Sequence, residues 1–187
     1  MKYWSMDVCN CDEGKCVECK EYEKSIKEIC EIASAFLKAR DKTDDQKPGL
    51  VVLDIDGTAL DDRRKGRKNE GLMSRHDPVH LFYEGAIGLG YEVVFLTARM
   101  SYNNHAQKNL TTEGYGAHEI IYSPTSVERD MSALALWKDY AREELEKKYT
   151  LVVCMGDQPM DVCGKHIGEQ QYLLPEPPKH QQACAIQ

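Results

Sequence analysis

Four aspartates and one threonine follow apolar segments that have the length of β-strands. They are Asp54 and Asp56 after "LVVL", Thr97 after "YEVVFL", and Asp157 and Asp161 after "TLVVCM". Acidic side chains beside a core are costly unless a cation or hydrogen-bond donors compensate them. Several carboxylates in one crevice also repel each other, so their convergence would predict a bound cation.

The chemistry that these residue types allow is phosphoryl transfer. Carboxylate oxygens suit a hard divalent ion, and Mg²⁺ is the common choice beside a phosphate. One carboxylate can attack phosphorus and form an aspartyl-phosphate, while a second protonates the leaving oxygen and later activates water. Asp54 and Asp56 suit this division if the chain turns sharply after them, and Gly57 permits such a turn.

The segments around these residues alternate between strand and helix patterns. Strands are predicted at 50–55, 91–96, 118–122, 150–155 and, more weakly, 171–174; helices are predicted at 21–40, 78–89, 101–113 and 130–148. Such alternation predicts an α/β fold, a mainly parallel sheet with helices on both faces. Because the active crevice of an open parallel sheet lies beyond the carboxyl ends of its strands, the acidic residues are expected to meet there.

The 187 residues predict one main domain with appended segments. We divide the chain into a Cys-rich segment (1–20), a helix and linker (21–47), a catalytic domain (48–178) and a tail (179–187). The net charge of −7 argues against a whole surface built for nucleic acid. With no long apolar run and no visible secretory signal, we expect no membrane partner and a cytoplasmic setting. The sequence does not specify an oligomeric state.

Four motifs in order, within about residues 48–178, resemble the haloacid dehalogenase (HAD) superfamily of phosphohydrolases. They are "DIDGT", "FLTAR", a lysine in the helical "WKDYAREEL", and "GDQPMD". The resemblance implies a Rossmann-like three-layer α/β/α fold with a HAD-like core. It also implies a magnesium-dependent phosphomonoesterase that acts through an aspartyl-phosphate intermediate.

The resemblance assigns a role to each motif residue. Asp54 matches the nucleophile, and Asp56 matches the acid/base, whose backbone carbonyl also binds Mg²⁺. Thr97 matches the hydroxyl that holds the transferring phosphoryl group, and Thr58 matches a residue that braces the first loop. Asp157 and Asp161 match the acidic pair that binds or supports the metal, so the implied Mg²⁺ site comprises Asp54, Asp56, Asp157 and Asp161.

Three lysines of the last long helix compete for the third motif. Lys147 and Lys148 lie at its C-terminal end, where cations suit the helix dipole, and are interpreted as solvated. Lys138 lies in the middle of the helix, in a K-x-x-x-R-x-x-L pattern similar to the acid-phosphatase branch of the superfamily. We therefore assign phosphate binding to Lys138, whose charge would stabilise phosphate oxygens and the buried acids.

Two further segments are similar to the branch of acid phosphatases and vegetative storage proteins. These are "NLTTEGY" (109–115) and "LLPEPP" (173–178). The chain departs from that branch at Gly57, where Glu is usual, and at Ala106, where Thr is common. The alternative function is a catalytically weak binding or structural protein of the same fold, although a degenerate relative commonly loses the nucleophile and this chain retains Asp54.

Substrate choice is predicted from what surrounds the motifs. The gaps 59–77 and 100–117 are too short for a separate cap domain, so the cap is minimal and the crevice open. The run "RRKGRK" (63–68) is either a collar for a polyanion such as a nucleotide or nucleic-acid end, or a solvated loop or targeting signal. We place Arg63, Arg64, Lys65 and Arg99 at the substrate rim, with a phosphorylated small molecule as the competing substrate. For Arg99 the alternatives are a structural partner of another residue and a direct contact with phosphate.

The remaining candidates have structural interpretations beside functional ones. Cys9, Cys11, Cys16 and Cys19 either bind one Zn²⁺ or are disulfides or free thiols in a tail. Cys30 and Cys154 are interpreted as small hydrophobic residues. His76 is interpreted as a surface residue, with a role at the crevice as the alternative, and Met131 and Trp137 are expected in the core.

Overall fold

The computed structural model describes residues 17–43, 46–61, 73–101, 105–116, 119–127 and 130–178. Within these residues the strands are β1 (Gly49–Leu53), β2 (Glu92–Met100), β3 (Glu119–Ser123), β4 (Thr150–Gly156) and β5 (Gln170–Leu173). The helices are α1 (Val17–Ala39), α2 (Asp77–Gly88), α3 (His105–Thr112), α4 (Met131–Glu146) and the single-turn α5 (Pro159–Val162), with a 3₁₀ turn at Thr125–Val127.

The strands form one parallel sheet in the order β3-β2-β1-β4-β5. From β1 the chain adds β2 and then β3 on one side of the sheet. It then passes through α4 to the other side of β1, where β4 and β5 follow. This reversal puts the switch point of the sheet between β1 and β4, whose registers align Leu53 with Met155. Ligands of open α/β sheets bind at such a point, beyond the carboxyl ends of the strands.

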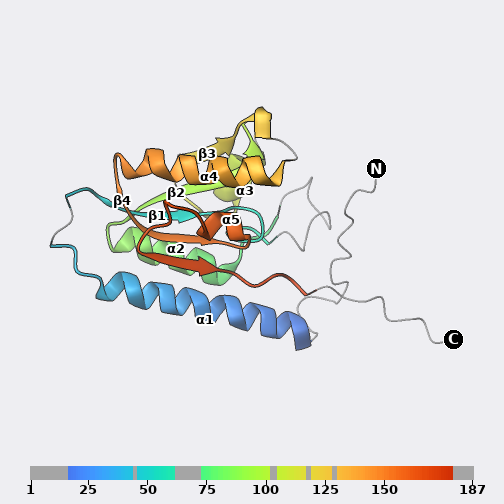
Figure 1. The fold of residues 1–187 in the computed structure, drawn as a ribbon. Helices are drawn as coiled ribbons and strands as arrows, with labels where there is room; N and C mark the ends of the chain where they lie inside the picture. The colour runs from blue at the N-terminus through green and yellow to red at the C-terminus, as the bar shows by residue number, and fades with distance from the viewer. Residues whose placement is uncertain are drawn as a thin grey trace, which may run out of the picture.

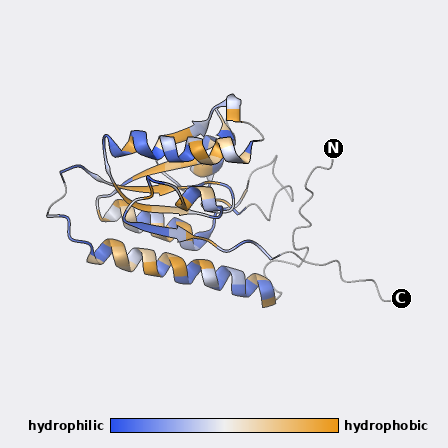
Figure 2. Cartoon of the chain, in the orientation of Figure 1, coloured by the Kyte–Doolittle hydropathy of each residue, from blue (hydrophilic) through white to orange (hydrophobic). Residues whose placement is uncertain are grey.

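The sheet is the middle of three layers, with helices on both of its faces (Figure 1). One face carries α1, α2 and α3, whose apolar residues share a core cluster with Val51, Leu53 and Phe95. The other face carries α4, which buries Ala141 and Leu145 against the opposite side of the same strands. β1 is buried along its whole length, since both its faces are covered. Figure 2 shows hydrophobic residues along the central strands, a more hydrophilic β5 at the edge, and helices that mix both kinds of residue.

The predicted fold class is confirmed, and the five predicted strands and four predicted helices all form. Two expectations about β2 and α4 were wrong. Thr97 and Arg99 lie within the last part of β2 rather than after it, where the pairing with β3 shifts register between Thr97 and Met100. Met131 is 59% exposed at the first turn of α4 rather than in the core, although Trp137 does pack against it.

The buried cysteines behave as small hydrophobic residues, as predicted. Burial, with Glu31 nearby, raises the pKa of Cys30 to about 12, and burial likewise raises that of Cys154 to about 12. Both thiols therefore stay protonated in the core. In the ranges given above, every helix is too short or too polar to cross a membrane.

The first prediction concerns α1, which packs along α2. Ile26 is completely buried in the core cluster that includes residues of both helices, whereas Ile32 of α1 is 61% exposed. Ile26→Ala should lower the free energy of unfolding by about 2–5 kcal/mol because it leaves a cavity. Ile32→Ala should change it by less than about 0.5 kcal/mol. Urea denaturation measures both, and equal effects would contradict the packing of α1.

Candidate active site

The first and fourth motifs meet at the switch point of the sheet. Asp54 follows β1 directly, and its backbone N–H donates to the carbonyl of Met155 at 3.0 Å. Asp157 follows β4, and Asp161 lies on α5 four residues later. Carboxylate oxygens of Asp54, Asp157 and Asp161 lie within 4.8 Å of one another, so the strand order brings these acids together as the sequence predicts.

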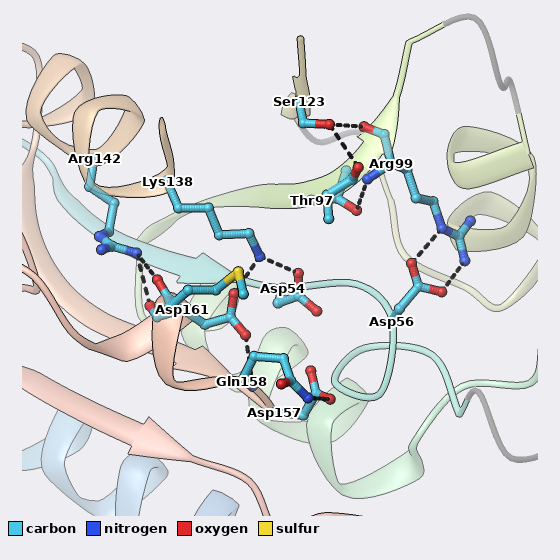
Figure 3. Close-up of polar contacts among 12 residues, drawn as sticks. Asp54, Asp56, Thr97, Arg99, Ser123, Lys138, Arg142, Asp157, Gln158 and Asp161 are labelled. Atoms are coloured by element: carbon cyan, nitrogen blue, oxygen red, sulfur yellow. Dashed lines mark hydrogen bonds and ion pairs between the residues drawn. The ribbon is translucent and has the colours of Figure 1, made fainter. Parts of the chain in front are cut away.

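Lys138 lies on α4, which covers the face of the sheet opposite to α1 and α2, and its side chain reaches the three carboxylates (Figure 3). Its ammonium donates to Oδ1 of Asp54 at 2.8 Å and makes a short contact with Oδ1 of Asp161. The side chains of all three residues are at least 92% buried. Buried charges persist only when they are paired, so this ammonium is the compensation that the acidic cluster needs.

Lys138 does not fully compensate the acids, because three carboxyl groups face one ammonium. Burial raises the pKa of Asp54 well above its ordinary value, against the lowering effect of Lys138, and Asp161 and Asp157 raise it further. Burial lowers the pKa of Lys138, but Asp54 and Asp161 outweigh burial and the net shift is upwards. The cluster therefore favours an additional positive charge.

Asp161 is held by both of its oxygens. Oδ1 accepts from Lys138, and Oδ2 accepts from the backbone N–H of Gln158 at 2.9 Å, as part of the capping box of α5. A β-carbon on Gly156 would come within 2.4 Å of the Asp161 side chain. Gly156 therefore makes room for Asp161 to approach the strand end.

Gly57 provides the turn that the sequence predicts. Its φ is +77°, a conformation that favours glycine. A β-carbon there would lie 2.7 Å from Oδ2 of Asp157, so the loop after β1 presses directly against the loop after β4. The Glu that the resembled branch usually has at this position would be strained in this arrangement.

The donor set of the cluster fits a hard divalent cation. Its oxygens come from carboxylates on two adjacent loops, as Mg²⁺ prefers. Asp54 and Asp157 are the better placed of the three for direct binding, because both Asp161 oxygens already accept hydrogen bonds. A divalent cation would also offset the excess of negative charge beside Lys138.

Asp56 does not join this cluster. Figure 3 shows it turned toward Arg99, which donates through Nε and Nη2 to its two oxygens at 2.7 and 2.8 Å. Thr97 is completely buried at the end of β2, and its Oγ1 accepts from the Arg99 backbone N–H at 3.1 Å. Thr58 is also completely buried, and its Oγ1 has no hydrogen bond to any described residue.

Arg142 is a supporting residue to which the sequence analysis gave no role. It is completely buried, and its guanidinium donates to the carbonyls of Met160, Asp161, Cys163 and His166. These bonds fasten the loop around α5 to α4, one turn beyond Lys138. The signal was present, since Arg142 is the Arg of the K-x-x-x-R-x-x-L pattern.

The "NLTTEGY" segment supports the first loop from the other side. The Tyr115 hydroxyl, buried among Tyr83 and Phe95, donates to the carbonyl of Ala59 at 2.9 Å. The Arg75 guanidinium donates to the carbonyl of Glu113 at 2.9 Å. The segment therefore contributes to positioning the loop that carries Asp54 and Asp56.

Several predicted site residues lie elsewhere. Cys9, Cys11, Cys16, Arg63, Arg64 and Lys65 are outside the described residues, so the zinc site and the basic collar stay predictions. Cys19 is buried in α1. His76 is 4% exposed rather than at the surface, packed near Tyr22 and Asp61. Lys147 pairs with Glu144 on the exposed end of α4, consistent with a solvated face.

A family model described as "HAD superfamily, subfamily IIIB (Acid phosphatase)" matches residues 67–181, more than half of the chain. The matched range begins after Asp54 and Asp56 and so does not include the first motif. The order of the strands, with β1 beside β4, places that motif in the site. The stem 28 kDa and 31 kDa glycoproteins of Glycine max are each 30% identical over 98 residues, 51% of this chain. The match spans only 39% and 34% of their lengths.

Solved structures share the fold. The class C acid phosphatase from Bacillus anthracis superposes with a TM-score of 0.69 at 18% identity, covering 86% of this chain and 79% of that one. The same enzyme with tungstate bound gives a TM-score of 0.58 at 18% identity, covering 77% and 66%. At this identity the likeness establishes the architecture, and the arrangement of the site follows from the contacts given above.

Removing the buried ammonium tests its role in the cluster. Lys138→Met leaves Asp54 and Asp161 without their cation and should lower the free energy of unfolding by about 3 kcal/mol or more near neutral pH. The pKa of Asp54 is raised in the folded state, so ionisation of Asp54 destabilises the fold as pH rises. The loss of stability in Lys138→Met should therefore be larger at about pH 8 than at about pH 5. Lys147→Met, which breaks an exposed pair, is the control and should cost less than about 1 kcal/mol. Urea denaturation in EDTA measures both variants.

The close approach of the two loops gives a further prediction. Gly57→Ala and Gly90→Ala impose similar backbone strain, of about 1–2 kcal/mol, because φ is +77° and +81° respectively. Only Gly57→Ala also meets Asp157, since nothing lies within 4 Å of a β-carbon at Gly90. Gly57→Ala should therefore be the less stable variant and should bind Mg²⁺ more weakly in calorimetric titration. Indistinguishable variants would refute the contact.

Proposed function

The chain belongs to subfamily IIIB of the HAD superfamily, the acid phosphatases, and from that premise we propose that it is a magnesium-dependent phosphomonoesterase acting through an aspartyl-phosphate. One observation carries the proposal: Lys138 is buried between Asp54 and Asp161 at the switch point, with Asp157 beside them. Three carboxyl groups lie beside one ammonium, so acidic groups remain in excess and favour a bound cation.

In the first step an oxygen of Asp54 attacks phosphorus, and the bond from phosphorus to the leaving oxygen breaks. The Lys138 ammonium orients Asp54 and stabilises the charge on the equatorial phosphate oxygens. The Thr97 hydroxyl, fixed at the end of β2, would hold the transferring group. Asp56, released from Arg99 at one oxygen and protonated there, would give that proton to the leaving oxygen and return as the carboxylate.

In the second step water attacks phosphorus, its proton passes to Asp56, and the bond from Asp54 to phosphorus breaks. Asp54 and Asp157 would hold Mg²⁺, with Asp161 and the backbone carbonyl of Asp56 as further ligands or supports. When bound, this ion supplies neutralisation of the carboxylates and of the phosphate charge. Asp161 in addition keeps Lys138 in place, and Arg142 keeps the α5 loop in place.

Two classes of substrate fit the proposed reaction. A minimal cap predicts an open crevice that admits either a phosphorylated small molecule or a nucleotide or nucleic-acid end. The acidic balance of the chain favours the small molecule, and the basic run 63–68 favours the polyanion. A cytoplasmic setting agrees with the free thiols of Cys30, Cys154 and Cys163 and stays part of the proposal.

Turnover of para-nitrophenyl phosphate tests the function. The protein should hydrolyse it with Mg²⁺, lose the activity in EDTA, and regain it when Mg²⁺ is restored. Asp54→Asn should lower kcat on the order of 10³-fold or more, because the amide is a poor nucleophile. Asp130→Asn, the same change at the exposed N-cap of α4, should retain activity.

Two outcomes would count against the proposal in different ways. Turnover that persists in EDTA would refute the metal-dependent mechanism. No turnover with Mg²⁺ would favour the alternative, a binding or structural protein of the same fold.

A further inference from the structure

We propose that Arg99 is a positioning residue that acts through Asp56, fixing the direction of the acid/base carboxylate at the rim of the site. The proposal rests on the phosphatase function above. Arg99 contacts both carboxylate oxygens, Nε to Oδ2 at 2.7 Å and Nη2 to Oδ1 at 2.8 Å. A two-point contact between planar groups fixes orientation as well as position, which one lysine could not do.

The backbone of Arg99 is itself held at two places. Its N–H donates to Oγ1 of Thr97, and Ser123 at the end of β3 donates to the carbonyl of Ala98 at 2.7 Å. These bonds lie where the pairing of β2 with β3 shifts register, and they hold the backbone from which the Arg99 side chain extends toward the first loop. Nη2 also contacts the sulfur of Met73 at 3.6 Å. The guanidinium is therefore anchored before it meets Asp56.

The two aspartates of the first motif consequently have different cations. Asp54 pairs with Lys138 in the interior, where the two side chains are 8% and 3% exposed. Asp56 pairs with Arg99 nearer the surface, where the exposures are 32% and 14%. This separation matches a division of labour, because the nucleophile must face the phosphorus and the acid/base must also reach solvent water.

The two chemical steps depend on Asp56 to different degrees. A good leaving group such as para-nitrophenolate departs as the anion and needs little help from an acid. Hydrolysis of the aspartyl-phosphate always needs a base to accept the proton of water. A residue that orients Asp56 should therefore affect the second step more than the first when para-nitrophenyl phosphate is the substrate.

Rapid-quench kinetics with para-nitrophenyl phosphate and Mg²⁺ tests the proposal. Arg99→Gln should lower steady-state kcat by about 10- to 100-fold, short of the 10²–10⁴-fold that a positioned acid/base contributes. It should nevertheless release a burst of about one para-nitrophenolate per active site. Arg99→Lys should retain only part of kcat, since a lysine keeps the positive charge but cannot donate to both carboxylate oxygens in parallel. Added guanidinium at millimolar concentration should partly restore Arg99→Gln.

Two further variants keep the test specific. Arg40 makes a similar two-point contact with Glu169, which lies beside the start of β4 at the opposite end of the sheet, so Arg40→Gln should leave kcat and the burst unchanged. Ser123→Ala loosens the Arg99 backbone and keeps the guanidinium, so it should lower kcat in the same direction by less.

The outcomes separate the two claims. An active wild type with an unaffected Arg99→Gln, or with burst and kcat lost together, overturns the positioning role alone. An inactive wild type overturns the proposed function and the positioning role with it.

Discussion

The contact of Lys138 with Asp54 and Asp161 is the interaction on which the rest of the site depends. Taking an ammonium and two carboxyl groups out of water costs several kcal/mol per ion, and their mutual attraction offsets that cost only in good geometry. The geometry is maintained by the surrounding backbone. Gly156 admits Asp161, Gln158 holds its second oxygen, and Arg142 fastens the loop. The site therefore requires support from β4, from α4 and from the loop that carries α5.

The sheet order explains why these particular residues meet. β1 and β4 are neighbours although almost a hundred residues separate them, and their carboxyl ends deliver Asp54 and Asp157 to one crevice. The crossover through α4 is the same segment that brings Lys138 over this crevice from the opposite face. A single topological feature thus supplies both the acids and the cation, and no inserted domain is needed to assemble them.

Much of this arrangement was predictable because it depends on local patterns. Apolar runs identified the strands, and the position of Asp54, Asp157 and Asp161 after two of them, with the likeness of "GDQPMD" to a known motif, indicated a shared site. Lys138 followed from its place within a helical motif. The partner of Asp56 was not predictable, since a guanidinium contact across 43 residues depends on the register shift in β2. Arg142 stood in the K-x-x-x-R-x-x-L pattern, but its role was missed because most of its partners are backbone carbonyls, which the sequence does not indicate.

The most direct measurement of the central claim is acid-quenched labelling with a phosphorus-32 phosphomonoester, followed by peptide mapping by mass spectrometry. The mechanism predicts Mg²⁺-dependent label on the peptide that contains Asp54 and none in Asp54→Asn. Label on a different peptide, or steady turnover with no labelled protein at any quench time, would contradict the assignment of Asp54 as the nucleophile that Lys138 holds in place.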